Sequence, residues 1–273
     1  MKQFVVLLAV ALASVSANSI PQWGFPEGRI INGHDAEKGE APYMVSLQNV
    51  LNLHFCGGTL INKRAILTAG HCLTRTRGKA VCGAHNLLDR RGVQTREFTN
   101  AQYVIHEDYN GGVGPNDIGL ILLDVNQAFN LNAVARDGSN PVGIVNLPSV
   151  NTEVNGNAKI YGWGLNNFGL PATKLQTVET IVVQWNECKN IVPYNAPLHE
   201  TNVCSETPGQ PDGACYGDSG GPLVTDSEAE AIQLGIVSWR PLPCVANYPT
   251  VYTNVVMFMP WIEEKLAQLF IEQ

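Results

Sequence analysis

The chain has 273 residues, of which 45% are hydrophobic, so it can bury a full core in one large domain or two small ones. Its formal net charge is −7 and it contains no basic run. Nucleic acid and anionic membranes are therefore not expected as its main partners.

Residues 1–17 are typical of a secretory signal peptide. Lys2 gives a short positive start, the apolar run from 4 to 13 is too short to span a bilayer, and Val15-Ser16-Ala17 has the small-residue pattern of a cleavage site. The alternative, a buried N-terminal helix, fits these flanking residues less well. We therefore expect a secreted, extracellular protein, and no later apolar stretch is long enough to hold it in a membrane.

The seven cysteines are informative because an exported protein meets oxidising conditions, which favour disulfides. No CxxC pair occurs, so a zinc knuckle or a thioredoxin-like site is not expected. The odd number leaves at least one thiol unpaired.

From Tyr43 onward, short apolar or alternating runs are separated by Gly, Pro, Asn and Asp. This spacing predicts an all-β sandwich or barrel, because a parallel α/β sheet would need long helices between its strands. The clearest predicted strands are 43–48, 55–61, 118–125, 181–185, 231–239 and 250–255.

One helix is predicted, from Pro260 to Phe270. Proline stands early in it, Glu263 and Glu264 lie in its first turn, and apolar residues recur four apart on one face.

Three short segments carry residue types suited to peptide hydrolysis, and they contain His71, Asp117 and Ser219. A serine hydroxyl is a weak nucleophile alone, but a histidine can take its proton and a buried carboxylate can fix the histidine tautomer. Glycines beside Ser219 permit a tight turn in which the N–H groups of Gly217 and Ser219 can point at a developing oxyanion. Taken singly, His71 could be structural and Asp117 a turn residue. The segments are 67–72, 116–120 and 217–222.

The order of His, Asp and Ser in these motifs resembles the trypsin, chymotrypsin and elastase family. The resemblance extends over residues 30–273, and it implies two six-stranded antiparallel β-barrels with the active site in the cleft between them, followed by a C-terminal helix. The N-terminal barrel would cover about 30–135, and the C-terminal barrel with the helix about 136–273. The supporting motifs are Ile30-Ile31-Asn32-Gly33, His54-Phe55-Cys56-Gly57-Gly58, Gly162-Trp163-Gly164 and Ser238-Trp239.

The function that this resemblance implies is a serine endopeptidase acting through an acyl-enzyme. His71 would be the general base, Asp117 its orienting partner, Ser219 the nucleophile, and Gly217 and Ser219 the oxyanion donors. No cofactor is expected. No metal site is expected either, because the calcium loop of some relatives would need a glutamate at Ala84.

The resemblance also implies three disulfides and one free thiol. Cys82 is expected to be a small buried core residue rather than a reactive thiol. The implied pairs are Cys56 with Cys72, Cys188 with Cys204, and Cys215 with Cys244.

Residues 18–29 are expected to be an activation propeptide that makes the product a zymogen. By resemblance, cleavage of Arg29–Ile30 would create an ammonium group that inserts beside Asp218 and assembles the oxyanion hole and the pocket. A buried carboxylate without a partner is costly, so this pairing would act as a switch. The alternative is that Asp218 is a simple turn residue.

A second element of this switch is a hypothesis. Ser46 and His54 are spaced as in family precursors in which such a pair holds the aspartate inactive before cleavage. The propeptide contains no cysteine, so it is expected to leave after cleavage.

The substrate pocket is expected to differ from that of a trypsin-like enzyme. Gly213 stands where such an enzyme has an aspartate, and Asp212, one residue earlier, is expected to point away. Arg240 and Thr250 replace glycines of open pockets, which predicts an elastase- or chymotrypsin-like preference. By resemblance, Ser238 and Trp239 bind the substrate chain as an added strand.

Two alternatives for the pocket remain open. Arg240 could pair with an acidic substrate residue, since a guanidinium binds carboxylate bidentately. It could equally turn to solvent and leave a chymotrypsin-like slot.

The overall pattern resembles insect digestive enzymes, so digestion in the gut lumen is the first hypothesis for the physiological role. The alternatives are a protease-fold binding protein with lectin-like activity and a processing protease in immunity. The expected partners are protein or peptide substrates, protein protease inhibitors, and a separate trypsin-like activator, since the pocket is not expected to accept Arg29.

Overall fold

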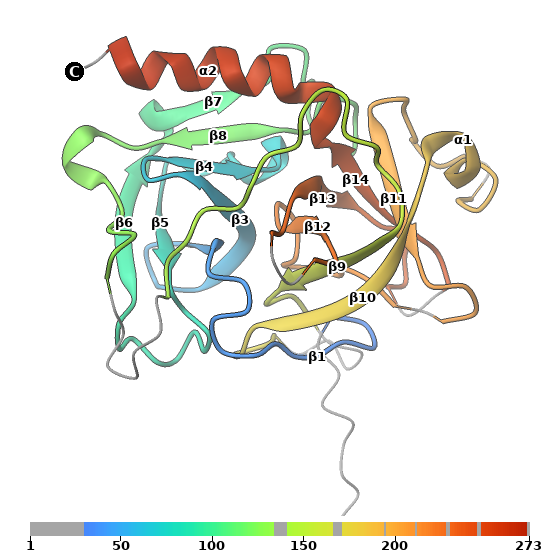
Figure 1. Ribbon diagram of the computed structural model, residues 1–273, viewed down its shortest axis with the longest axis horizontal. Helices are drawn as coiled ribbons and strands as arrows, with labels where there is room; N and C mark the ends of the chain where they lie inside the picture. The colour runs from blue at the N-terminus through green and yellow to red at the C-terminus, as the bar shows by residue number, and fades with distance from the viewer. Residues whose placement is uncertain are drawn as a thin grey trace, which may run out of the picture.

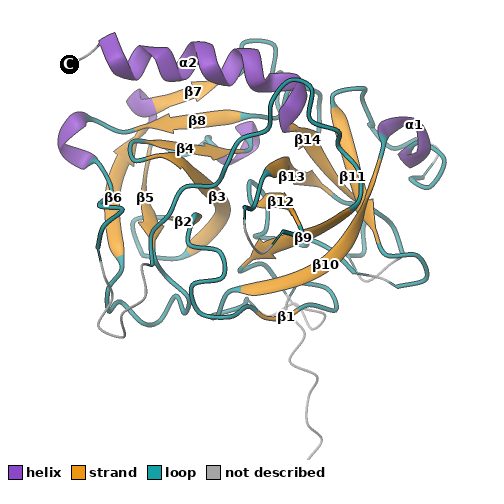
Figure 2. Cartoon of the chain, in the orientation of Figure 1, coloured by secondary structure: helices purple, strands orange, loops and turns teal. Residues whose placement is uncertain are grey.

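The computed structural model describes residues 30–133, 141–165, 171–193, 195–210, 212–227, 230–244 and 247–271. The predicted signal peptide and propeptide, Arg29 included, lie outside these residues. Figures 1 and 2 show two strongly curved sheets side by side, with a long helix along one of them.

The first sheet contains seven antiparallel strands in the order β6-β5-β2-β3-β4-β8-β7. Between the described residues no further pairing joins β6 to β7, so this unit is a half-barrel. Its interior is filled by side chains from β2, all of whose residues are buried, and from β4. The strands are β2 (Met44–Gln48), β3 (His54–Asn62), β4 (Ala65–Thr68), β5 (Arg77–Cys82), β6 (Gln94–Thr99), β7 (Tyr103–Ile105) and β8 (Gly119–Leu122).

The second sheet is a closed barrel. Strand β10 pairs with β11 on one side and β9 on the other, which closes the ring β10-β11-β14-β13-β12-β9. A seventh, short strand, β1 (His34–Asp35), pairs with the start of β10. The ring strands are β9 (Asn157–Gly162), β10 (Gln176–Val183), β11 (Asn202–Glu206), β12 (Pro222–Thr225), β13 (Gln233–Trp239) and β14 (Thr250–Asn254).

The predicted all-β class with two barrel-like units is therefore confirmed, and the second unit has the six-stranded ring that the resemblance implied. The difference lies in the first unit, which the described pairings leave partly open.

The predicted C-terminal helix is confirmed as α2 (Met259–Ile271), preceded by the 3₁₀ turn η4 (Val255–Phe258). Although it follows the second barrel, α2 lies along β7 and β8 of the first unit in Figure 1. Glu107 accepts hydrogen bonds there from Trp261 at 2.8 Å and lies 2.7 Å from the Lys265 ammonium group. Among the described residues, none of the helices is long and apolar enough to cross a membrane.

Each end of the described chain therefore packs on the unit that is farther from it in the sequence. Strand β1, at the start, joins the second barrel, and α2, at the end, covers the first unit. Between them, Thr59 of β3 donates a 2.6 Å hydrogen bond to Gln233 of β13. The remaining short elements are η1 (Gly70–Cys72), η2 (Asn100–Gln102), η3 (Val125–Gln127) and α1 (Trp185–Cys188).

The cysteines form the three pairs that the resemblance implied: Cys56–Cys72, Cys188–Cys204 and Cys215–Cys244. Cys82 is the free cysteine and is 1% exposed, at the end of β5 opposite Val45 of β2. Burial raises the pKa of its thiol, because the thiolate would lose its hydration.

We predict that the Cys82 thiol is inert in the folded protein. With the disulfides intact, Ellman's reagent should detect no thiol under native conditions and one thiol per chain in denaturant. Reaction of one equivalent in the native state within minutes would contradict this assignment. A Cys82→Ala variant, which should show no thiol in denaturant, is the control.

Candidate active site

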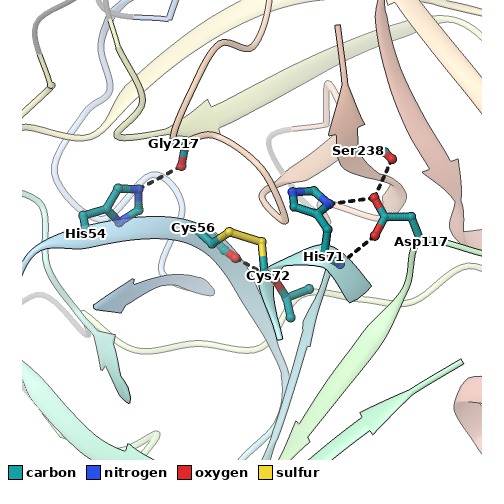
Figure 3. The surroundings of a disulfide bond; sticks show 9 residues. His54, Cys56, His71, Cys72, Asp117, Gly217 and Ser238 are labelled. Carbon is teal, nitrogen blue, oxygen red and sulfur yellow. Dashed lines mark hydrogen bonds and ion pairs between the residues drawn. A yellow bond between two sulfur atoms is a disulfide. The ribbon is translucent and has the colours of Figure 1, made fainter. Parts of the chain in front are cut away.

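His71 and Asp117 meet because their strands are neighbours. His71 lies in η1, which starts two residues after the end of β4, and Asp117 lies two residues before the start of β8. These strands pair with Thr68 opposite Gly119. The His71 ring nitrogen Nδ1 lies 2.8 Å from Asp117 Oδ2, and the His71 backbone N–H donates to Asp117 Oδ1 at 2.9 Å (Figure 3). Two bonds therefore fix both the ring and the backbone of the histidine.

Asp117 is completely buried, and residues from the other unit also bond to it. Ser238 donates to Oδ2 at 2.6 Å, and Thr253 donates to the Asp117 carbonyl oxygen at 2.8 Å. A carboxylate can only accept hydrogen bonds, so the proton on neutral His71 resides on Nδ1. The other ring nitrogen, Nε2, is left as a base.

Ser219 lies in a tight turn between β11 and β12. Within it, the Asp218 N–H donates to Cys215 O at 3.0 Å and the Gly221 N–H donates to Asp218 O at 2.9 Å. Gly217 and Gly220 have φ angles of +95° and +78°, which only glycine adopts without strain. Both flanking glycines are thus required by the turn.

The turn is pressed against the first unit. The Gly57 N–H of β3 donates to Ser219 O at 2.8 Å, and a Cβ on Gly220 would lie 2.6 Å from Gly57 O. Ser219 itself is half-buried and lines a cavity together with Ser238, whose hydroxyl reaches Asp117. The three predicted catalytic residues are therefore located at the junction of the two units.

Asp218 points away from this cavity into the protein. Its carboxylate accepts from the N–H groups of Gly164 at 2.7 Å and Cys215 at 2.9 Å and is completely buried. Burial raises its pKa to about 7, which these two bonds only partly offset. A Cβ on Gly162 or Gly164 would collide with the carboxylate, a role of this glycine pair that the sequence reasoning did not identify.

The segment that begins at Ile30 lies against the same region. Ile30 is fully buried with a φ of +48°, and Ile31 exchanges two backbone hydrogen bonds with Gly213, at 3.0 and 3.2 Å. The Ile30–Ile31 segment therefore packs beside Gly213, the predicted pocket floor.

His54 bonds to Ser46 and to the backbone of Gly217. Its Nδ1 lies 2.8 Å from the Ser46 hydroxyl, and its Nε2 lies 2.9 Å from Gly217 O (Figure 3). Both ring nitrogens are thus engaged, and in this conformation Ser46 and His54 do not hold Asp218. Burial lowers the pKa of His54 to about 4, so the ring is neutral and donates through Nε2 to the Gly217 carbonyl oxygen.

The cavity beside Ser219 has a volume of about 270 Å³. Of the predicted pocket residues, Ser238, Trp239 and Arg240 line it, whereas Gly213 and Thr250 lie behind the Arg240 side chain. Three exposed apolar residues that also line it are not among the predicted pocket residues: Val113, Tyr216 and Leu242. Tyr216 is next to Gly217 and Leu242 lies two residues after Arg240, so sequence position could have indicated these two.

Among the described residues, His71, Cys56 and Cys72 form a cluster of atoms close enough to hold a metal ion. The two sulfur atoms are joined in a disulfide, so they offer no thiolate ligand (Figure 3). The disulfide instead links Cys72, the residue next to His71, to Cys56 of β3.

Comparison with known proteins gives the class of this site. The family profile described as Trypsin matches residues 30–262. Lectizyme of Glossina austeni is 48% identical over 269 residues, covering 97% of each chain. Trypsin of Xenopus laevis is 31% identical over 268 residues, covering 97% of this chain and 99% of its own.

Solved structures agree with this result. Neuropsin, a serine protease expressed in the limbic system of mouse brain, superposes with a TM-score of 0.73 at 28% identity, covering 87% of this chain and 100% of its own. The chain belongs to the trypsin family. It is a serine endopeptidase, a hydrolase with protein substrates.

The buried Asp218 carboxylate predicts how stability of the uncleaved chain depends on pH. The folded-state pKa of about 7 is above the ordinary 3.8, so the folded state binds more protons between these values, and stability falls as pH rises through this window. The loss is about 4 kcal/mol at most, by 1.36 kcal/mol per unit of pKa shift. Urea unfolding of the uncleaved chain between pH 4 and 8 measures it.

An Asp218→Asn chain is the control, because it retains the groups that titrate elsewhere, including His54. Subtracting its pH dependence isolates Asp218. A flat difference between the two chains would show that folding does not raise the pKa of Asp218, and a difference that rises with pH would show that the folded state stabilises the charged carboxylate.

Proposed function

We propose that the chain is a secreted serine endopeptidase, made as a zymogen, in which His71, Asp117 and Ser219 form the catalytic triad. The observation that carries this proposal is the double hydrogen bond of Asp117 to His71, with Ser219 held at the same junction by Gly57.

In the proposed mechanism, Ser219 Oγ attacks the scissile carbonyl carbon while His71 Nε2 takes the hydroxyl proton. The N–H groups of Gly217 and Ser219 stabilise the oxyanion, and Asp117 stabilises the imidazolium. His71 then returns the proton to the leaving amine, and water hydrolyses the acyl-enzyme by the same steps. The His54 bond to Gly217 O supports this role, since it fixes the Gly217–Asp218 peptide unit, which lies between the two residues that donate to the oxyanion.

Activation would occur by cleavage of Arg29–Ile30. The new ammonium group on Ile30 would pair with Asp218, whose buried carboxylate has a pKa of about 7 and no cationic partner among the described residues. Because Ile31 is bonded to Gly213, this pairing would stabilise the pocket floor and the Ser219 turn together.

The pocket is proposed to reject Lys and Arg and to accept side chains of elastase- or chymotrypsin-like size. Gly213 offers no carboxylate, and Arg240 narrows the space above it. Digestion in a gut lumen is the proposed role, with a separate trypsin-like activator and protein protease inhibitors as partners.

Cleavage at Arg29 should control the reactivity of Ser219. A fluorophosphonate probe should label the cleaved protein at Ser219 and leave the uncleaved precursor at least about 100-fold less reactive, since the oxyanion donors are assembled by activation. Mass spectrometry of the labelled peptide identifies the site.

Matched variants separate the roles. Ser219→Ala should abolish labelling, whereas Asp117→Asn should retain a folded protein but lower kcat by about 10⁴-fold through the wrong tautomer of His71. Equal labelling before and after cleavage would refute the proposed switch, and labelling elsewhere would refute the proposed nucleophile.

The precursor should not activate itself. Incubated alone at high concentration, it should keep the Arg29–Ile30 bond, whereas catalytic trypsin should cleave it within minutes; N-terminal sequencing reads out both. Release of the Ile30 end in wild type but not in Ser219→Ala would contradict the proposed pocket.

A lectin-like activity is the second candidate function, favoured by the name of the 48% identical relative, Lectizyme. It is tested with Ser219→Ala protein on a glycan array, where binding would establish a role independent of catalysis.

A further inference from the structure

The Arg240 side chain turns inward and covers the floor of the cavity. A Cβ placed on Gly213 would collide with Arg240 Nη1 and Thr250 Oγ1 and lie 3.4 Å from Arg240 Cζ. The guanidinium group therefore occupies the space in which a residue-213 side chain would stand. The floor of the cavity carries a positive charge instead of the negative one of a trypsin-like pocket.

The lining of the cavity makes this charge important. Among the described residues that line it, Arg240 is the only charged one, and the others are apolar or neutral. Ala214, Val237 and the Cys215–Cys244 disulfide belong to the walls. Against such apolar walls, a charge-assisted hydrogen bond is stronger than in water.

Asp212 is close to Arg240 but does not give the cavity a negative charge, because its side chain does not line it. It is 5% exposed and is not among the described residues that line the cavity. Burial raises the pKa of Asp212, and hydrogen bonds from Thr207 oppose this shift more strongly than the charge of Arg240 does. Both Thr207 and Arg240 therefore act on the Asp212 carboxylate, which does not line the cavity.

Other groups around Arg240 leave the guanidinium cationic. Burial lowers its pKa, while the nearby groups Tyr252 and Asp212 raise it. Since an arginine loses its proton only far above neutral pH, the side chain stays charged in the cavity.

We propose that this cavity receives an acidic side chain, so that the enzyme cleaves after Asp or Glu, with Arg240 as the residue that determines specificity. This inference rests on the proposed function, because it assigns a substrate class to the same site. The shortened cavity suits a short side chain, and a carboxylate can accept two hydrogen bonds from one guanidinium. A Lys or Arg side chain would meet a like charge.

The alternative is that Arg240 acts only as a steric filter, as a bulky neutral residue would. Both ideas predict the same preference for the size of the substrate side chain, but only the first predicts a preference for a negatively charged one. Isosteric substrate pairs separate them, because Asp and Asn, or Glu and Gln, have nearly the same shape.

The experiment uses the activated enzyme and peptides that differ only in the residue before the cleaved bond: Asp, Asn, Glu, Gln, Ala, Phe and Lys. We expect kcat/KM for Asp or Glu to exceed that for its amide by about 100-fold or more, as for other desolvated charge pairs. Arg240→Gln should abolish this ratio, and Arg240→Lys should retain part of it. Arg240→Gly should raise kcat/KM for the Phe peptide, because it enlarges the cavity.

Arg91→Gln is the matched control. Arg91 is 82% exposed and pairs with Asp89 on the surface, so its loss removes one arginine and should leave the substrate profile unchanged. Thermal unfolding of all variants checks that they are folded.

Fluorophosphonate labelling distinguishes the two possible failures. An enzyme that is labelled at Ser219 and cleaves after Ala or Phe, but treats Asp like Asn and Glu like Gln, overturns this inference and leaves the proposed function standing. A cleaved chain that is neither labelled nor active on any peptide overturns both.

Discussion

The structure depends on one buried carboxylate that both barrels bind. His71 of the first unit donates to Asp117 through its ring and its backbone, and Ser238 and Thr253 of the second unit donate to the same residue. Asp117 is fully buried, so removing any of these donors would take a hydrogen bond from a group that solvent does not reach in the folded chain. The same bonds that orient the histidine therefore also fix how the two units meet.

The Ser219 turn adds a second constraint, which is steric. Gly162, Gly164 and Gly220 allow backbone and carboxylate to approach so closely that a single Cβ would collide, and a Cβ on Gly57 would lie only 3.0 Å from Gly221 Cα. Such contacts lack freedom to adjust, because neighbouring atoms are backbone or fully packed. At Gly213 the space is filled differently. The guanidinium group of Arg240 occupies the place where a side chain of residue 213 would lie.

Much of the architecture could be predicted from local patterns. The strands near 43–48 and 55–61 and the helix from Pro260 appear within a few residues of their predicted bounds, since alternation and helical periodicity report which face is buried. The first unit's open edge and the location of α2 on that unit could not be predicted, because both depend on contacts between distant segments. The bond of His54 to Gly217 O could not be predicted either, since spacing alone does not distinguish Gly217 from Asp218 as its partner.

The sequence by itself determined the family, the three motifs and the absence of an aspartate at residue 213, because these are properties of residue identity and order. Only the tertiary structure decided which group fills the pocket floor and which bonds hold Asp218. The physical reason is that a long side chain such as Arg240 has many rotamers, and its position is selected by burial and by the charges of residues brought near it in the folded chain.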